Sequence, residues 1–509
     1  MSRGPIEGAG MSLVDRTRAV LHRAMQVYRG TPHEARLAAV HDRFDEPLRV
    51  AVAGRVKAGK STLLNALVGE RLAPTDTREC TRIVTWYSDG HTYQVLLHPK
   101  HAAARQARFT RSAGALEVDL GGLRPDDVER MVVTWPSQTL RTATLIDTPG
   151  IGSLSEQVSR RAWELLVPED EETPADAVLY LMRHAHAGDV EFLRAFHDVE
   201  VSRPNPVNAI GVLSRADEIA VGRLDSMASA RCVAARLGTD PNIRRVVQTV
   251  VPVAGLLAET AVTLTENEVR QLRHVAAVPA AEADVLLLSA DRFSTRMPEL
   301  GLTSIEREEL LVRLGLFGVR LAADLLRRGV ASTASELARE LAGQSGIREL
   351  QDVLHSLFFE RRDVLKSRSA LLALGALCRT ARRPGSDVVA AEVEQIIASA
   401  HPFDELRVLS SLRAGWISAK PEVIEELEYV IGGVGGAAHV RLRLAPQAGP
   451  AELASAAALA LARWQRRAEN PLTTHEMVVA ARVAIRSCEG MLSALARGGE
   501  TGGRHGTFL

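Results

Sequence analysis

Short apolar runs alternate with helix-like segments in the first half of the chain. The runs are compact, end in glycine or polar residues, and recur at 48–54, 81–87, 143–147, 176–182, 207–213 and 247–253. Segments with helical spacing separate most of them, including 60–69, 187–198 and 225–238. This alternation predicts a mostly parallel sheet with helices on both faces. The stretch 88–140 interrupts the pattern, and we expect it to form an inserted antiparallel edge.

The rest of the chain is helical in pattern. Apolar residues from Leu13 to Tyr28 repeat at helical spacing, and no strand-like run follows residue 258. Apolar pairs recur every seven residues over 346–383, which predicts one continuous helix of ~55 Å at 1.5 Å per residue. Such a helix needs partners along its length, so we expect it to be the spine of a bundle. The candidate partners are the N-terminal helix and the segments 387–400, 420–431, 450–468 and 474–495.

These patterns divide the chain into five parts. The predicted division is a disordered leader (1–10), N-terminal helices packing on a stalk (11–45), an α/β head with an insertion near 88–140 (46–340), a helical stalk (341–497) and a disordered tail (498–509). The chain has 509 residues, which is too long for a single hydrophobic core.

Charge and cysteine content narrow the class of protein. Lys plus Arg and Asp plus Glu both total 62, so the basic excess typical of a nucleic-acid-binding protein is missing. The four cysteines form no CxxC pair, which argues against a zinc site or a disulfide framework. The longest apolar runs are about ten residues, whereas a membrane-spanning helix needs roughly 20. We therefore expect a cytoplasmic protein that touches membranes peripherally.

A glycine-rich motif follows the first predicted strand. The segment GRVKAGKS, from Gly54 to Ser61, fits the pattern GxxxxGK[ST] and leads into a predicted helix. Backbone N–H groups in such a loop surround phosphate oxygens, and the helix N-terminus adds positive potential. Lys60 is expected to reach the β- and γ-phosphates, and the Ser61 hydroxyl to ligate Mg²⁺. The predicted phosphate-binding residues are Gly54, Arg55, Val56, Lys57, Ala58, Gly59, Lys60, Ser61 and Thr62; the alternative is a glycine-rich turn before a helix.

A second phosphate-binding motif, DTPG, ends the predicted strand 143–147. Asp147 can hold Mg²⁺ through water, and the Gly150 N–H can meet a γ-phosphate. A threonine that closes over Mg²⁺ and the γ-phosphate should precede the strand at 81–87. Thr81 is the first choice and Thr77 the second, while the alternative role for this hydroxyl is to cap the strand. The predicted metal ligands are thus Ser61, Thr81 and Asp147.

The base should be chosen at Ser214, Arg215 and Asp217. A carboxylate accepts hydrogen bonds from N1 and the N2 amino group of guanine, whereas adenine would leave it unpaired, a difference that can discriminate by about 10⁴-fold. The usual motif is [NT]KxD; this chain has Ser and Arg in place of its first two residues, and arginine can stack on the base as lysine does. Downstream, Ala254 lies where a loop could offer a backbone N–H to the guanine O6.

The ordered set GRVKAGKST, ECTRIVT, DTPG, SRAD and PVAG resembles the dynamin superfamily, and its bacterial, isoniazid-inducible members in particular. The resemblance extends to the helical flanks FGVRLA, SGIREL and RRDVLKSRSALLAL. It implies a P-loop GTPase head that hydrolyses GTP with Mg²⁺ and a stalk built from both chain ends. It also implies pairing through the heads or with a paralogous dynamin-like partner, and action at the inner face of the plasma membrane.

Two departures from the family bear on catalysis. Ile151 follows Gly150 where small GTPases often have a water-orienting glutamine, so hydrolysis must rely on Lys60, Thr81 and backbone groups such as Gly150. Lys57 occupies a position that is serine in eukaryotic dynamins. We hypothesise that it stabilises charge developing between the β- and γ-phosphates; the alternative is a lysine pointing into solvent.

Several weaker signals leave alternatives open. Basic residues follow the predicted spine and its end, at Arg361, Arg362, Lys366, Arg368, Arg379, Arg382 and Arg383. They form either a solvated face or a contact with anionic lipid. The glycine-rich segment 431–436 favours a turn between helices over an apolar tip, and His184 and His186 favour a structural role over a metal site. The alternative function is a nucleotide-gated assembly partner of a paralogue with little hydrolysis of its own; a ribosome-linked GTPase is disfavoured by the zero net charge.

Overall fold

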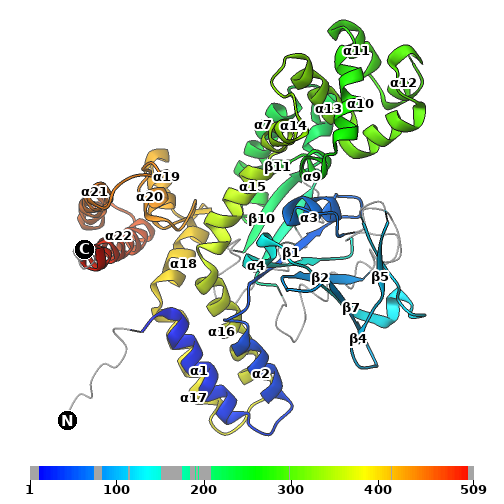
Figure 1. The fold of residues 1–509 in the computed structure, drawn as a ribbon. Helices are drawn as coiled ribbons and strands as arrows, with labels where there is room; N and C mark the ends of the chain where they lie inside the picture. Colours follow the sequence, from blue (N-terminus) through cyan, green and yellow to red (C-terminus); the bar gives the residue numbers. More distant parts are fainter. Residues whose placement is uncertain are drawn as a thin grey trace, which may run out of the picture.

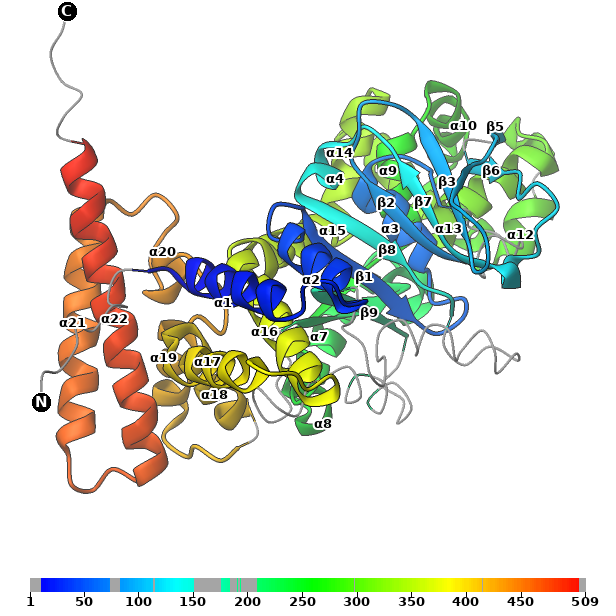
Figure 2. The ribbon, with the colours of Figure 1, turned by 90° about the horizontal axis from the view of Figure 1, so that it is seen from below.

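The computed structural model describes residues 11–73, 83–112, 115–150, 175–183, 190, 193, 208–296, 298–413 and 415–502. They form an α/β head, a neck of helices beneath it, and an outer helical part on the side of the neck away from the head (Figures 1 and 2). The predicted combination of a P-loop GTPase-type α/β head with a helical stalk is confirmed.

The head is built on one nine-stranded sheet. Its order is β11-β10-β9-β1-β8-β2-β7-β3-β4, and β11, β10, β9, β1 and β8 run parallel. β1 is central and buried because its residues are almost all apolar. The strands are β1 (Leu48–Gly54), β2 (Val84–Ser88), β3 (Gln94–Pro99), β4 (Arg105–Gln106), β7 (Val128–Thr134), β8 (Ala143–Asp147), β9 (Ala177–Met182), β10 (Ala209–Ser214) and β11 (Val250–Val253).

The insertion forms the sheet edge that the sequence predicts. β2 is antiparallel to β8, and β3 is antiparallel to both β7 and β4. β2 and β7 are parallel to each other, a pairing that sequence pattern did not show. A separate hairpin, β5 (Phe109–Ser112) and β6 (Ala115–Val118), lies beside this edge.

Helices surround the sheet and form a lobe after β11. Capping boxes fix the starts of three of them: Thr265 pairs with Glu268, Thr303 with Glu306, and Thr333 with Glu336. The elements are α3 (Lys60–Val68), α4 (Gln138–Thr142), η3 (Ala216–Gly222), α7 (Ser226–Thr239), α8 (Pro241–Arg244), α9 (Gly255–Thr263), α10 (Glu266–Ala277), α11 (Ala280–Leu286), α12 (Ala290–Thr295), α13 (Ser304–Arg327) and α14 (Ala334–Gln344).

The neck joins helices from both chain ends, as predicted. α1 (Leu13–Val27) packs against α16 (Arg362–Thr380) and α17 (Ser386–Ser399), while α2 (His33–Asp42) packs on α1 (Figure 2). Arg23 Nε donates to Glu392 Oε2 at 2.6 Å, and the Tyr28 hydroxyl donates to the Ala381 carbonyl at 2.9 Å. These contacts tie the chain before the head to the chain after it.

The prediction of one continuous helix over 346–383 is wrong. α15 (Ile347–Leu354) leads into a π-helical turn (His355–Phe359), and α16 starts anew after Arg361, whose φ of −107° and ψ of 13° leave the helical region. The break is fixed from a distance, because the Glu360 carboxylate accepts the backbone N–H groups of Gly436 and Ala437 at 3.0 and 2.8 Å. Residues 431–436 thus form a turn between helices against this break.

The outer part has its own apolar core. Trp464, Leu409 and Met477 are among the residues at its centre. Its helices are α18 (His401–Arg413), α19 (Pro421–Val430), α20 (Ala438–Arg441), α21 (Pro450–Glu469) and α22 (His475–Gly502). α22 continues beyond residue 498, the predicted start of the tail. Within the described ranges, no helix is long and apolar enough to cross a membrane.

Part of the predicted basic face is buried. Lys366 and Arg368 are 4% and 5% exposed, so neither a solvated face nor a lipid contact describes them. The Lys366 ammonium donates to the backbone carbonyls of Arg43, Phe44 and Glu46, which lie between α2 and β1. This arrangement ties α16 to the strand that carries the phosphate loop. The three arginines near the α16–α17 turn, Arg379, Arg382 and Arg383, are exposed.

Candidate nucleotide-binding site

The predicted phosphate loop connects β1 to α3. Gly54 has a φ of 145°, and a Cβ there would lie 2.5 Å from the Leu181 carbonyl oxygen, so only glycine fits this close approach. Gly59 caps α3 in a left-handed conformation with φ 92°. Lys57 also has a positive φ, 61°, a strained conformation for a side-chain-bearing residue. The loop therefore has the geometry that the motif predicts.

Lys60, at the first turn of α3, is held over the loop. Its Nζ donates to the carbonyl oxygens of Gly54 and Arg55, each at 3.2 Å. Burial lowers the pKa of Lys60, and the nearby Asp147 carboxylate opposes this effect. A half-buried cation that backbone carbonyl oxygens hold over this loop is suited to bind a phosphate oxygen.

Ser61 and Asp147 meet as predicted. The Ser61 hydroxyl donates to Asp147 Oδ2 at 3.0 Å, which joins the start of α3 to the end of β8. Asp147 Oδ1 is buried and has no hydrogen-bond partner among the described residues. Burial raises the pKa of this carboxyl. A hydroxyl beside a carboxylate with an unpaired oxygen fits a Mg²⁺ ion, which prefers oxygen ligands. Thr81, the third predicted ligand, and Thr77 lie outside the described residues.

The DTPG turn packs directly on the phosphate loop. Thr148 donates to the Val52 carbonyl through both its N–H and its hydroxyl, at 3.3 and 2.9 Å. A Cβ on Gly150 would lie 2.5 Å from Val56 Cγ2 and 2.8 Å from Val56 Cα. The glycine is therefore required by the close approach of the two loops, which places its backbone beside the phosphate-binding segment. Ile151 lies outside the described residues.

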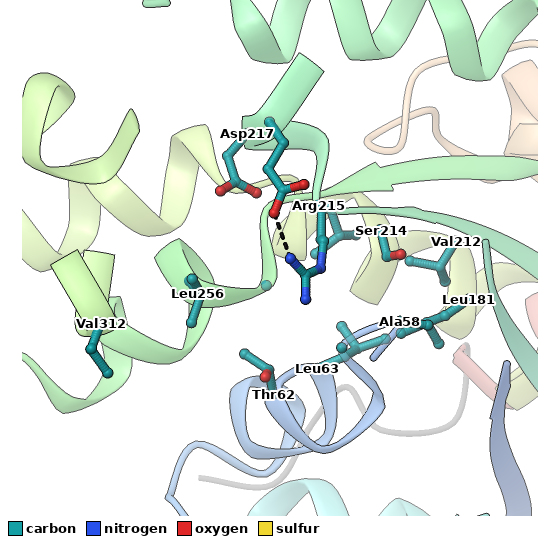
Figure 3. A pocket seen from close by; sticks show the side chains of 14 residues that line it. Ala58, Thr62, Leu63, Leu181, Val212, Ser214, Arg215, Asp217, Leu256 and Val312 are labelled. Atoms are coloured by element: carbon teal, nitrogen blue, oxygen red, sulfur yellow. Dashed lines mark hydrogen bonds and ion pairs between the residues drawn. The ribbon is translucent and has the colours of Figure 1, made fainter. Parts of the chain in front are cut away.

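A cavity of about 250 Å³ opens beside the phosphate loop (Figure 3). Asp217 is 8% exposed there, and burial raises its pKa to about 6. The Arg215 guanidinium points into the cavity, where it donates to the Lys57 carbonyl at 3.1 Å and to Glu218 Oε1 at 2.6 Å. Ser214 lines the wall, and its hydroxyl donates to the Met182 carbonyl at 3.3 Å. Arg215 thus bridges the predicted base and phosphate sites.

The structure gives Ala254 a different contact from the one expected. Its N–H donates to the Ser345 carbonyl at 2.9 Å, and the residue is fully buried. Gly255 and Leu256, the next two residues, line the cavity instead. An amide from this turn toward a base would therefore come from the start of α9.

Six further lining residues are not among the predicted site residues. Leu63, Leu181, Val212, Val253, Glu218 and Val312 also border the cavity. Val312 belongs to α13 and lies far along the chain from every motif, so no local signal points to it. The others directly follow a motif or lie on β9, β10 and β11, the parallel strands on one side of β1 in the sheet.

Comparison with known proteins agrees with this geometry. A sequence model of the Dynamin family matches residues 50–216, the part that holds the phosphate loop and DTPG and that ends one residue before Asp217. The chain is 40% identical to the isoniazid-induced protein IniC of Mycobacterium tuberculosis over 490 residues, which cover 95% of this chain and 99% of IniC. The chain belongs to the bacterial dynamin-like proteins.

Other bacterial dynamin-like proteins match over shorter spans. The isoniazid-induced protein IniA of Mycobacterium tuberculosis is 29% identical over 323 residues, or 58% of this chain and 45% of IniA. The bacterial dynamin-like protein of Nostoc punctiforme is 33% identical over 115 residues, or 20% of this chain and 16% of that protein. Family membership supports GTPase activity in general, and the isoniazid-inducible resemblance expected from the sequence is confirmed.

Proposed function

We propose that this bacterial dynamin-like protein binds and hydrolyses GTP with Mg²⁺, producing GDP and phosphate. The observation that carries the proposal is the joint geometry of two loops: Ser61 reaches Asp147 across the ends of β1 and β8, and Asp147 keeps one buried oxygen unpaired. Ser61 and Asp147 would hold Mg²⁺ there, and the ion would offset the negative charge of the phosphates.

The chain's own residues have distinct roles in this proposal. Lys60 binds phosphate oxygens, the Gly150 N–H meets the γ-phosphate, and the exposed Lys57 offers a cation at the loop. Asp217 accepts from the guanine edge, and Gly255 offers the amide toward O6 in place of Ala254. Thr81 remains the proposed residue that closes over Mg²⁺.

Arg215 does the work of the lysine in the usual [NT]KxD motif. Its bond to the Lys57 carbonyl fixes the guanidinium across the cavity, where its flat face can cover a purine. The same bond couples the base-binding loop to the phosphate loop. This supports guanine selectivity despite the departure from the motif.

Turnover of GTP is the direct test. Lys60→Ala should lower the rate by at least about 100-fold, because an electrostatic group aimed at the phosphates is removed. Lys100→Ala, which removes an exposed lysine of the insertion, is the matched control and should leave the rate unchanged. Equal rates in wild type and Lys60→Ala would refute the proposed site.

We further propose that the GTPase cycle drives assembly or conformational change at the inner face of the plasma membrane. The exposed Arg379, Arg382 and Arg383 at the α16–α17 turn could attract anionic lipid by about 1 kcal/mol each. Changing all three to Glu should abolish flotation with anionic liposomes. The control changes three exposed arginines of the head, Arg108, Arg236 and Arg270, to Glu. Equal flotation of the two triple variants would contradict a lipid contact at the α16–α17 turn.

A second candidate is a nucleotide-gated partner of an IniA-like paralogue with little hydrolysis of its own. Ile151 favours it, because an isoleucine side chain cannot orient the attacking water. In that case GTP would promote a heteromer with the paralogue while the rate per molecule stays low. In the GTPase proposal, pairing of the heads makes the GTP turnover rate per molecule rise with protein concentration. A turnover rate that does not change with concentration, together with GTP-dependent formation of the heteromer, would favour the second candidate.

A further inference from the structure

Helix α13 is bent at Gly315. This residue has φ 64° and ψ 176°, a conformation that glycine alone adopts without strain, so α13 consists of two helical halves. The Arg313 carbonyl lies just before the bend and accepts the Thr260 hydroxyl of α9. A glycine and a hydroxyl from another helix therefore fix the bend together.

The bend fits the loop that carries Asp217. A Cβ on Gly315 would lie 3.7 Å from Asp217 Oδ2 and 3.9 Å from Leu256 Cδ1. At the end of η3, the Arg320 side chain from the second half of α13 donates to the Gly222 carbonyl, and it also donates to the Leu287 carbonyl. α13 therefore contacts η3 near its start, at Asp217, and at its end, at Gly222.

The first half of α13 reaches the cavity itself. Val312 lies one turn before the bend and lines the cavity next to Leu256, on the side away from Leu181 and Val212 (Figure 3). Its side chain is 70% exposed, although it borders a pocket with a buried carboxylate. A purine seated at Asp217 would cover this apolar surface and remove it from water.

We propose that α13 is the second wall of the guanine site, with Val312 as the apolar cover and Gly315 as the positioning residue for Asp217. This inference rests on the proposed GTP binding and deepens it, because it assigns base selectivity to a helix that carries none of the nucleotide-binding motifs. Arg215 and Val312 then cover the purine from two different elements: Arg215 lies in the loop after β10, and Val312 lies on α13.

Nucleotide affinity tests the wall, measured by calorimetry with GDP and, as a probe without a base, inorganic tripolyphosphate. Gly315→Ala should weaken GDP binding by about 10-fold, since alanine resists φ 64° and shifts the carboxylate. Gly329→Ala is the matched control, because it has a similar φ of 68° at the end of the same helix and a Cβ there meets no described atom within 4 Å. Both variants should bind tripolyphosphate like wild type.

Val312→Asn keeps the inference testable if Gly315→Ala does not fold, because Val312 is largely exposed. It should weaken GDP binding by about five-fold through the lost apolar cover. Ile305→Asn is its control: Ile305 is 69% exposed and lies two turns earlier on the same face of α13.

The outcomes separate this inference from the proposed function. Normal GDP binding by wild type with unchanged binding by Gly315→Ala and Val312→Asn overturns the wall alone. Equal losses for GDP and tripolyphosphate also overturn it, because they indicate general damage to the site. Wild type that binds no GDP overturns the proposed function and the wall with it.

Discussion

Replacing Asp217 by asparagine should stabilise the nucleotide-free head while removing its preference for GTP. Burial raises the pKa of Asp217 from 3.8 to about 6, and the residue is 8% exposed. Between about pH 4 and 6 the folded protein thus keeps a proton that the unfolded chain has released. Stability is therefore lost as the pH rises through this window, by about 3 kcal/mol for roughly two pH units.

An asparagine side chain carries no charge, so the Asp217→Asn variant escapes this loss at neutral pH. For a domain of this size about 3 kcal/mol corresponds to a melting temperature raised by roughly 6–12 °C, as an upper limit. Scanning calorimetry of nucleotide-free wild type and Asp217→Asn at about pH 7.5, 6 and 4 measures the difference. It should be largest at the highest pH and smallest at the lowest, where the folded wild type holds the proton and the unfolded chain is still about half protonated.

Glu218→Gln is the control, because it makes the same chemical change one residue later on an exposed side chain that pairs with Arg183 and Arg215. It should change stability by no more than about 1 kcal/mol. Asp217→Asn should also prefer xanthosine triphosphate to GTP. An Asp217→Asn head that melts below wild type at neutral pH, or by the same margin at every pH, would refute the reasoning.

Three further changes test the rest of the structure. Asp176→Ala leaves the buried Arg43 without the carboxylate that it contacts at 2.7 Å. The variant should lose about 3–5 kcal/mol of stability, measured as a lower melting temperature. An unchanged melting temperature would contradict the importance of this buried ion pair. Gly346→Ala puts a Cβ 2.1 Å from the Pro252 carbonyl at φ 79° and should destabilise the start of α15 by at least about 2 kcal/mol, whereas a neutral effect in thermal unfolding would contradict the packing. Lys57→Ala should slow GTP turnover because the cation is lost. Lys57→Gly should slow turnover equally, although it also relieves the strained backbone at φ 61°. Full turnover in either variant would show that Lys57 has no role in catalysis.

The sequence predicts best where the cause is local. β1 and the phosphate loop follow from an apolar run, two glycines and a lysine that lie close together in the chain, from Leu48 to Lys60. The pairing of Ser61 with Asp147 also follows, because each ends or follows a strand at the same edge of a parallel sheet. The helix starts at Thr265, Thr303 and Thr333 have an equally local cause in their capping boxes.

The sequence predicts least where contacts between distant segments of the chain determine the local structure. The seven-residue repeat over 346–383 is real, yet Glu360 bonds to the turn after Ile431 and the helix breaks there. Lys366 has the sequence context of a surface lysine, but the carbonyls between α2 and β1 surround it. Val312 borders the nucleotide cavity because of a bend at Gly315, and a lone glycine inside a helical pattern does not show which loop it will meet.

Calorimetric titration of the nucleotide-free protein with GTP and with ATP, each with Mg²⁺, tests the central claim most directly. The account predicts that GTP binds at one site per chain at least about 100-fold more tightly than ATP, since Asp217 pairs with guanine and not with adenine. Equal affinities for the two nucleotides, or no heat from GTP with folded protein, would contradict it.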